Sequence, residues 1–241
     1  MWRPDGLAWR GGASVCRLWS VCLGQTVAHP GLLCCAGVFV SLSQIYPVMN
    51  ILVINGSPRR GGNVATMLDA MRFEAAGRGH SVTVVDIAGL HIAPCTGCMA
   101  CRTRGDCVLP ADDAHRVAGL LRSADAVIVG APCYWGNMPG QLKVLFDRIV
   151  YAMMGEGKRG LPRPLHKGKR AIIVTACTTP WPFNRLFGQS AGTVRAIREI
   201  LRYSGFSVVG TVQCAGTKGA PLVSGRRLRR CTRLVGRLER R

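Results

Sequence analysis

Acidic side chains are scarce in this sequence. Its 241 residues include 12 Asp and Glu against 32 Lys and Arg, which gives a formal net charge of +20. A surface of this sign attracts anions such as phosphate-bearing cofactors and nucleic acid. The excess is uneven, because residues 218–241 hold Lys218 and eight arginines against the single acid Glu239. Much of the positive charge therefore lies beyond the part of the sequence that is patterned for folding.

Several familiar motifs are also missing. The sequence has neither a GxGxxG dinucleotide fingerprint nor a GxxxxGK[ST] phosphate loop. The five histidines show no metal-ligand spacing, and no histidine or carboxylate constellation typical of acid–base catalysis is evident. We therefore expect no catalytic side chain, and we expect any chemistry to be supplied by a bound cofactor.

Residues 1–48 lack the pattern of the remainder. No Lys, Arg, Asp or Glu occurs from Leu18 to Met49. Three interpretations compete: a wrongly assigned upstream start, an apolar membrane or export segment, and a folded extension. We favour the first, because MNILVINGSPRR begins at Met49 and runs directly into a buried-strand pattern, as a natural N-terminus would. Residues 1–48 are thus an N-terminal extension of uncertain status.

From residue 50 onward, short apolar runs alternate with amphipathic segments. The apolar runs predict strands at 50–55, 80–87, 125–132, 169–177 and 206–216. The amphipathic segments predict helices at 62–79, 112–124, 139–153 and 190–205, with Asp112 or Asp113 as the N-cap of the second.

This alternation predicts an α/β protein with a parallel sheet covered by helices on both faces. Five strands fit a flavodoxin-like three-layer sandwich. We expect this domain to span residues 49–217. The segment 218–241 has apolar residues among its arginines, so a basic amphipathic helix is one possibility, but we favour a solvated basic tail.

The stretch GSPRRGGN, residues 56–63, follows the first strand and opens the first helix. A helix N-terminus offers free N–H groups and a positive dipole end, which suit a phosphate. Ser57 and Asn63 can donate hydrogen bonds, and Arg59 or Arg60 can add charge-assisted ones. The glycines that let the backbone approach an anion are Gly56, Gly61 and Gly62. The alternative is a glycine-rich turn with surface arginines.

The stretch APCYWGNMPGQLK, residues 131–143, follows the third strand. In the flavodoxin strand order a ligand sits above the first and third strands, and both glycine-bearing loops follow those strands. Tyr134 and Trp135 can face a planar ring, and the backbone at Gly136 and Asn137 can bond its polar edge. A phosphate at one loop and a flat ring at the other describe a mononucleotide, for which FMN is the natural candidate. The alternative for Trp135 is a core or interface aromatic.

Four of the twelve cysteines lie within thirteen residues, CTGCMACRTRGDC, residues 95–107. Cys95, Cys98, Cys101 and Cys107 follow the pattern C-x2-C-x2-C-x5-C. Disulfides within so compact a set would be strained, and structural zinc favours two separated pairs. The unbroken C-x2-C-x2-C run is the one that bacterial ferredoxins wrap around a cubane. We favour a [4Fe–4S] cluster, with zinc and redox-active thiols as alternatives. Cys133 in the ring loop and Cys177 are weaker candidates, better read as small buried apolar residues.

Together these three stretches resemble the NADPH-dependent FMN reductase-like superfamily, and within it the iron–sulfur flavoproteins, over roughly residues 49–216. In that family the first loop holds the FMN phosphate, which implies this role for Ser57, Arg59 and Asn63, with Gly62 beside them. The third-strand loop lines the flavin ring, which implies this role for Pro132, Tyr134, Trp135, Gly136, Asn137 and Met138. Cys133 lies in the same loop and can touch the flavin. The compact motif implies cluster ligation by Cys95, Cys98, Cys101 and Cys107. One residue departs from the family pattern: Val64 stands where Thr or Ser often binds phosphate.

The resemblance implies an FMN-dependent oxidoreductase that transfers electrons, with NAD(P)H or a ferredoxin-like protein as its redox partner and a homodimer or homotetramer as its assembly. The cysteine content favours a reducing, cytoplasmic location and no membrane association. One alternative is an NAD(P)H-dependent FMN or quinone reductase that lacks a cluster. A second is a redox sensor that binds nucleic acid through its basic tail, although the tail carries no recognisable nucleic-acid motif.

Overall fold

The computed structural model describes residues 32–35, 38–41, 47–157, 160–218 and 223–239. The chain divides into a unit that ends at Leu42 and a unit that begins at Ser43. The first contains strands β1 (Leu32–Cys35) and β2 (Val38–Ser41), which pair antiparallel. The interpretations of residues 1–48 as a misassigned start or an apolar segment fall mainly outside the described residues. Within those residues, no helix is both long enough and apolar enough to cross a membrane.

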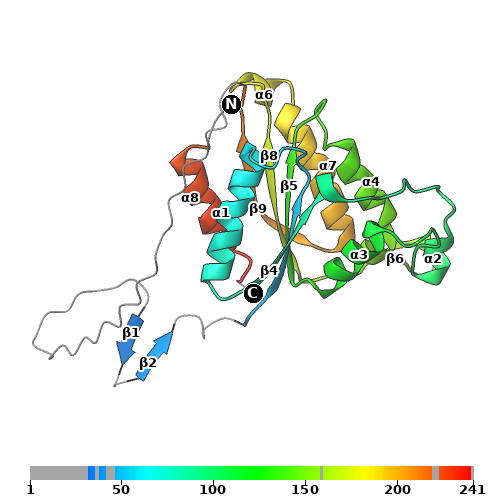
Figure 1. Cartoon of the computed structure of the whole chain (residues 1–241), viewed down its shortest axis with the longest axis horizontal. Coiled ribbons are helices and arrows are strands. Elements are labelled where there is room, and N and C mark those ends of the chain that lie inside the picture. The colour runs from blue at the N-terminus through cyan, green and yellow to red at the C-terminus, as the bar shows by residue number, and fades with distance from the viewer. Residues whose placement is uncertain (1–31, 36–37, 42–46, 158–159, 219–222, 240–241) are drawn as a thin grey trace, which may run out of the picture. The chain divides into compact units, whose positions relative to one another are not determined.

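The second unit is built on one parallel sheet in the order β4-β3-β5-β8-β9 (Figure 1). Its strands are β3 (Asn50–Asn55), β4 (Ser81–Asp86), β5 (Ala126–Pro132), β8 (Arg170–Ala176) and β9 (Ser207–Cys214). By sequence rank this order is 2-1-3-4-5, the doubly wound order of flavodoxin. The predicted fold class is confirmed.

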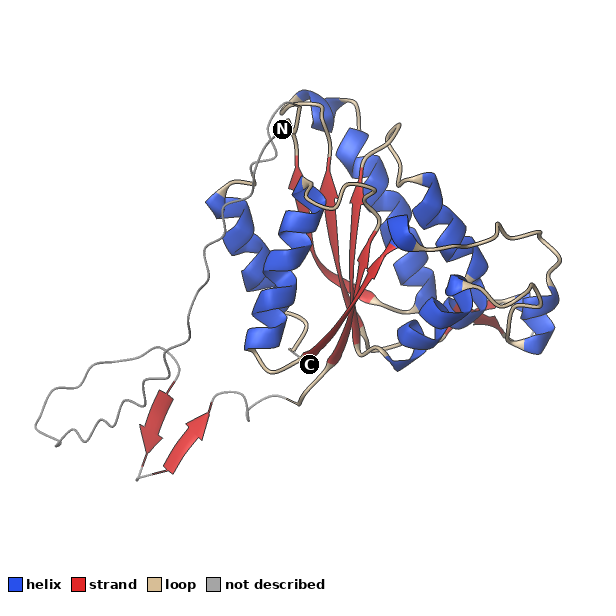
Figure 2. Cartoon of the chain, viewed as in Figure 1, coloured by secondary structure: helices blue, strands red, loops and turns tan. Residues whose placement is uncertain are grey.

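Helices cover both faces of the sheet, which makes three layers (Figure 2). One face carries α1 (Asn63–Gly77) and α8 (Gly225–Val235). The other carries α3 (Asp113–Ser123), α4 (Gly140–Arg148), α5 (Val150–Met153) and α7 (Gln189–Ser204). The shorter elements are η2 (Ile87–Gly89), α2 (Ala100–Arg104), the antiparallel pair β6 (Met154–Glu156) and β7 (Pro162–Pro164), and α6 (Phe183–Leu186).

Alternation along the strands divides the core into two clusters. Val53 of β3 and Val174 of β8 face α1 and α8, whereas Ile54 and Ile173 face α3, α4 and α7. The central strands are buried on both faces, so they appear in the sequence as continuous apolar runs. Because such runs are visible in the sequence, these strands can be predicted from the sequence alone.

The C-terminal segment corrects one expectation. Residues 225–235 form the helix α8, which packs against α1 and β9 and buries Cys231, Leu234 and Val235. The acidic residue beyond it is fixed as well, since the Glu239 carboxylate lies 2.9 Å from Nε2 of His80. The amphipathic pattern therefore determines the structure of this segment despite its high charge. The segment belongs to the helical layer on the α1 face of the sheet and is not a solvated tail.

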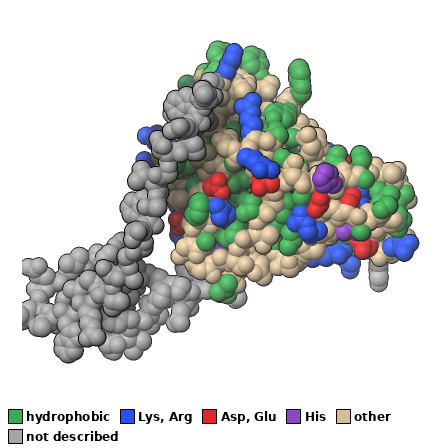
Figure 3. Space-filling model, viewed as in Figure 1, with side chains coloured by type: hydrophobic (Ala, Val, Ile, Leu, Met, Phe, Trp, Pro, Cys, Tyr) green, Lys and Arg blue, Asp and Glu red, His purple; other side chains and the backbone are tan. Residues whose placement is uncertain are grey.

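Positive charge is not gathered into one block on the face seen in Figure 3, where Lys and Arg side chains lie among Asp and Glu side chains. The described residues include exposed pairs one helical turn apart, such as Lys143 with Asp147 at 2.6 Å and Arg116 with Asp113 at 3.0 Å. Exposed pairs of this kind contribute little to stability.

Candidate functional site

The loops after β3, β5, β8 and β9 enclose a cavity of about 450 Å³ at the carboxyl edge of the sheet. We call it the edge pocket. Its lining consists of Ser57, Arg59, Gly61, Gly62, Asn63, Val64, Pro132, Cys133, Tyr134, Ala176, Cys177, Thr178 and Thr217. It therefore lies where a doubly wound sheet is expected to bind its ligand.

The first wall of the edge pocket is the turn from β3 into α1. The Gly56 N–H donates to the Gly130 carbonyl of β5 at 2.7 Å, which ties this turn to the neighbouring strand. A Cβ at Gly56 would lie 2.8 Å from Cδ2 of Leu142 and 3.0 Å from the Gly130 carbonyl oxygen, so a larger residue would force its neighbours to shift. The Ser57 Oγ accepts from the Arg59 N–H at 3.2 Å, which orders the following residues.

The start of α1 is prepared for an anion. Its N-cap, Gly62, supplies no side-chain hydrogen bond, and its first turn holds no acidic residue. The Asn63 Oδ1 is buried and has no hydrogen-bond partner among the described residues. The uncapped N–H groups are donors that an anion could satisfy. The Asn63 Oδ1 is an acceptor, so it calls for a donor and does not itself favour an anion. Arg59 adds positive charge at the pocket, whereas Arg60 lines a separate hollow.

The position after Asn63 carries no hydroxyl. Val64 is buried and packs against β5, where a Cβ on Gly130 would meet Val64 Cγ1 at 2.8 Å. Its side chain contributes packing to the floor of the edge pocket and no hydrogen bond. Where the family pattern has a hydroxyl, Val64 therefore gives this chain a packing contact and no hydrogen-bond donor.

The loop after β5 makes a tight turn that divides the predicted ring-binding residues. The Tyr134 N–H donates to the Asn137 carbonyl at 2.9 Å, and the Asn137 N–H donates to the Tyr134 carbonyl at 2.9 Å. Between them Trp135 and Gly136 have positive φ of 53° and 73°, as a two-residue type I′ turn requires. Met138 follows the turn and is buried in the core.

The structure therefore brings Pro132, Cys133 and Tyr134 into the edge pocket together with Ser57, Arg59, Gly62 and Asn63. It does not bring Trp135, Gly136, Asn137 or Met138 to the lining. Trp135 projects into solvent and is fully exposed. The Asn137 carbonyl instead accepts from Thr193 Oγ1 of α7 at 3.0 Å, so this part of the turn is anchored to a helix.

Some residues of the edge pocket were not singled out from the sequence as lining. Ala176 and Thr178 flank Cys177 at the end of β8, and Thr217 follows β9. Their location at this edge could be predicted in general terms, since the residues that follow the strands of a parallel sheet gather at one edge. The precise positions depend on strand register, which the sequence alone does not specify.

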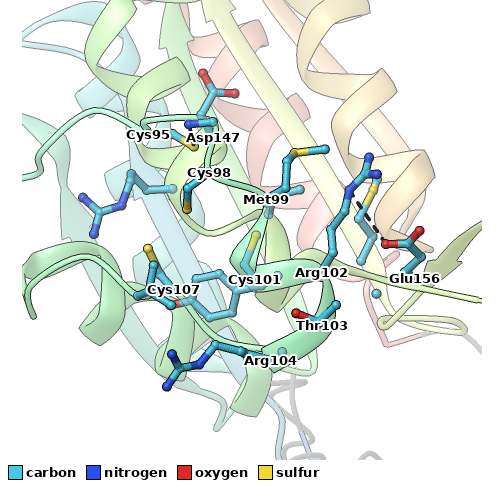
Figure 4. A pocket seen from close by; sticks show the side chains of 18 of the residues that line it. Cys95, Cys98, Met99, Cys101, Arg102, Thr103, Arg104, Cys107, Asp147 and Glu156 are labelled. Carbon is cyan, nitrogen blue, oxygen red and sulfur yellow. Dashed lines mark hydrogen bonds and ion pairs between the residues drawn. The ribbon is translucent and has the colours of Figure 1, made fainter. Parts of the chain in front are cut away.

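A second cavity, of about 630 Å³, is formed by the long loop between η2 and α3 together with α5, β6 and β7. We call it the cysteine cavity. All four clustered cysteines, Cys95, Cys98, Cys101 and Cys107, line it (Figure 4). All four are free thiols. Within the described residues no three Cys, His, Asp or Glu side chains converge closely enough to form a metal-binding group.

The four thiols nevertheless influence one another. Burial, followed by the negative charge of Cys107, Cys95 and Cys98, raises the pKa of the Cys101 thiol. Four thiolates close together need a compensating cation or basic groups. Arg102, Arg104 and Arg122 line the same cavity, where Nε of Arg102 lies 3.8 Å from Oε2 of Glu156.

One buried ion pair fastens both ends of the cysteine loop. The guanidinium of Arg148 is buried and donates to Asp112 Oδ2 at 2.8 Å, to Asp112 Oδ1 at 3.2 Å and to the Ala93 carbonyl. The Ala93 N–H in turn donates to Asp112 Oδ2 at 3.1 Å. Asp112 also caps α3 through the Ala114 N–H. The residues before Cys95 and after Cys107 are thus held at one point.

The same contacts set the charge of Asp112. Burial favours its neutral form, but hydrogen bonds from the Ala93 and Ala114 N–H groups and the charge of Arg148 outweigh burial and lower the pKa of Asp112. On the opposite wall, burial and then the charge of Asp106 raise the pKa of Tyr151 to about 12. Tyr151 therefore stays neutral beneath the loop, with the guanidinium carbon of Arg122 5.1 Å from its ring centre.

Comparison with known proteins agrees with the fold. Residues 49–228 match the family model for the flavodoxin-like fold, and the chain belongs to this family. Within it, the chain is 44% identical over 102 residues to an iron–sulfur flavoprotein of Methanosarcina thermophila, which covers 42% of this chain and 53% of that protein. The predicted resemblance is confirmed.

Two further similarities bear on the alternatives. The chain is 31% identical over 106 residues to an FMN-dependent NADH:quinone oxidoreductase of Haemophilus influenzae, covering 42% of this chain and 50% of that protein. The solved NAD(P)H:quinone oxidoreductase of Methanothermobacter marburgensis superposes with a TM-score of 0.64 at 18% identity, covering 81% of this chain and 98% of that one. The structural likeness concerns the fold. This chain spans about half the length of both curated relatives.

Proposed function

We propose that the edge pocket binds FMN and that the chain is an FMN-dependent oxidoreductase. The observation that carries this proposal is the uncapped start of α1, free of acidic residues, at the mouth of a cavity bounded by three further strand-end loops. Ser57, Arg59, Gly62 and Asn63 would hold the phosphate. Pro132, Cys133 and Tyr134 would contact the ring, while residues 135–138 hold Tyr134 in place through the anchored turn. FMN supplies transfer of one or two electrons, and the protein supplies its orientation.

We further propose that Cys95, Cys98, Cys101 and Cys107 hold a [4Fe–4S] cluster. Three observations support this. The donor set has the right number and type, all four thiols are free around one cavity, and arginines surround them. The name of the Methanosarcina relative points the same way. Because the sulfurs do not converge as they stand, binding would draw the loop together. A bound cluster would supply single-electron transfer.

Together these proposals describe an electron-transfer flavoprotein that receives electrons from NAD(P)H or a ferredoxin-like protein. We propose a homodimer or homotetramer as its assembly. The fully exposed Trp135 beside the edge pocket supports such an assembly, because a large exposed aromatic side chain is typical of contact surfaces.

A second candidate is an FMN-dependent NAD(P)H:quinone reductase without a cluster. It is favoured by the spread of the cysteine sulfurs and by the similarity to the Haemophilus protein. The nucleic-acid-binding sensor draws support only from the arginines of α8, whose apolar face is already occupied by α1 and β9. It predicts binding that weakens steeply with salt.

One experiment separates the first two candidates. The full chain is purified anaerobically, and its absorbance spectrum is recorded with iron, sulfide and flavin assays on the same sample. About four irons and four sulfides per flavin are expected for a [4Fe–4S] flavoprotein. Flavin without iron after anaerobic reconstitution would leave the quinone reductase. Absence of flavin binding on titration with FMN would overturn both.

A further inference from the structure

Two cysteines stand side by side at the edge of the sheet. Cys133 follows β5 and Cys177 follows β8, which are neighbouring parallel strands. The strands are in register up to Pro132 and Ala176. The ladder continues one step further, because the Cys133 N–H donates to the Ala176 carbonyl at 2.8 Å. The next residues of the two strands are therefore separated by about the spacing of neighbouring strands, roughly 4.8 Å.

Both side chains leave the sheet on the same face. Ala131 and Ile173 belong to the core cluster on the α7 side. Cys133 is two residues beyond Ala131 and Cys177 is four beyond Ile173, so both point to that side, because side chains alternate along a strand. The contact of Cys133 agrees with this parity, because its thiol donates to the Gln189 carbonyl of α7 at 3.1 Å. The Cys177 thiol donates to the Thr179 carbonyl at 3.5 Å. Both cysteines line the edge pocket. Burial, and then the nearby Cys133, raise the pKa of the Cys177 thiol.

We propose that Cys133 and Cys177 are a redox-active thiol pair that forms a disulfide in the wall of the edge pocket. A Cα separation near 4.8 Å is within the range of about 4.4–6.8 Å that disulfides span. The two thiols have different access, since Cys133 is half-buried and Cys177 is buried. Cys133 is therefore the sulfur that a small disulfide in the pocket reaches, and Cys177 is the one that resolves it.

The chemistry is thiol–disulfide exchange with a low-molecular-weight disulfide such as oxidised glutathione as the oxidant. The Cys133 thiolate attacks one glutathione sulfur, the glutathione S–S bond breaks, and one glutathione leaves and takes up a proton. The Cys177 thiolate then attacks the Cys133 sulfur, and the second glutathione leaves in the same way. In total two protein S–H bonds are lost and one S–S bond forms. Two electrons and two protons pass to glutathione.

This inference goes beyond the proposed function, because the exchange requires neither flavin nor cluster. Its consequence for the edge pocket is geometric. A Cys133–Cys177 disulfide would join the loops after β5 and β8 across the pocket wall, next to the backbone that positions Tyr134. Oxidation would therefore act on the shape of the pocket.

The test uses the full chain without flavin in anaerobic buffers of increasing ratio of oxidised to reduced glutathione. Free thiols are blocked at acidic pH, and the chain is digested with trypsin. Cys133, Cys177 and Cys214 lie on three separate tryptic peptides. Mass spectrometry is expected to find a linked Cys133–Cys177 peptide whose fraction rises with the ratio. Cys133→Ser abolishes it, and Cys177→Ser traps a glutathione adduct on Cys133.

Cys214→Ala is the matched control. Cys214 is buried next to these loops, and its carbonyl accepts from the Cys177 N–H at 2.8 Å, but its side chain belongs to the core cluster on the α1 and α8 face. Its replacement is expected to leave the linked peptide unchanged. The proposal is overturned if no such peptide forms at any ratio, or if the unaltered chain accumulates the glutathione adduct on Cys133. Flavin content, measured separately, reports on the proposed function alone.

Discussion

The edge pocket and the cysteine cavity are built by different means. In the edge pocket, every lining loop starts at the end of a strand in the parallel ladder, so backbone hydrogen bonds fix where each residue begins. The cysteine cavity is lined by a long loop that contains only the one-turn helix α2 and is fastened at its ends. The shape of the edge pocket is therefore set by the fold itself. The shape of the cysteine cavity depends on the Arg148–Asp112 pair that holds the ends of its loop, and on any group bound there.

The largest effect is expected from replacing one of the cysteines that we propose to hold the cluster. Cys101→Ser should reduce iron bound after anaerobic reconstitution by roughly tenfold or more, since even an outer partner of a metal ligand is worth about 10–100-fold in affinity. Flavin content should stay unchanged, because the edge pocket is separate. Cys214→Ala is the control. Equal iron in both variants would contradict ligation by Cys101.

The anchor of the cysteine loop should show the next largest effect. Arg148→Met leaves the partly buried Asp112 carboxylate without its cationic partner and should lower the free energy of unfolding by about 3 kcal/mol. Urea unfolding followed by circular dichroism measures this change. Arg116→Met removes an exposed pair with Asp113 and should cost less than about 1 kcal/mol. Similar losses for the two variants would show that the buried pair is not an anchor.

A pH dependence should follow from the same pair. Because the folded state lowers the pKa of Asp112, its ionised form stabilises the fold above the ordinary carboxyl pKa of about 3.9, and this contribution is lost as pH falls through and below that value. Between about pH 5 and 3 the unfolding free energy should fall more steeply than in Asp112→Asn, by up to about 1.4 kcal/mol per pH unit.

Asp69→Asn is the control for this measurement, since Asp69 is exposed and pairs only with Arg72 at 3.3 Å. Its pH profile should match that of the unaltered chain. Parallel profiles for the chain and for Asp112→Asn would rule out a special contribution of Asp112.

The smallest effect concerns the edge pocket. Val64→Thr is nearly isosteric and places a hydroxyl at the start of α1, where it can donate to a bound phosphate. One added hydrogen bond is worth about 1 kcal/mol, so FMN should bind roughly fivefold more tightly by fluorescence titration. Val64→Ala, which removes packing without adding a donor, should not tighten binding. Weaker binding by Val64→Thr would mean that no phosphate oxygen lies within reach.

The elements that follow the ladder were predictable from sequence, because buried runs such as NILVIN end at glycine or polar residues and their order determines where loops gather. This reasoning placed Ser57, Asn63 and Tyr134 at one edge. Trp135 does not line the edge pocket, because the type I′ turn directs its side chain outward, and no pattern in a single strand reveals that turn.

Two other features depend on distant partners. Arg148 looks like an ordinary helix-ending arginine, and only its approach to Asp112, 36 residues earlier, makes it a buried anchor. The segment 225–235 looks like a charged tail, although Leu228, Cys231, Leu234 and Val235 already repeat at helical spacing. In this segment the helical periodicity of the apolar residues predicts the structure better than the net charge does.

The anchoring of the cysteine loop has a consequence in polymer terms. Bringing the ends of a flexible segment together has an entropic cost that grows only slowly with its length. Here the contacts of Arg148 with Ala93 and Asp112 hold the two ends of the loop together and offset that cost. We therefore expect residues 94–111 to tolerate insertion or deletion with little penalty to the stability of the sheet. The cysteine loop could then be altered, and the proposed metal binding with it, while the edge pocket is preserved.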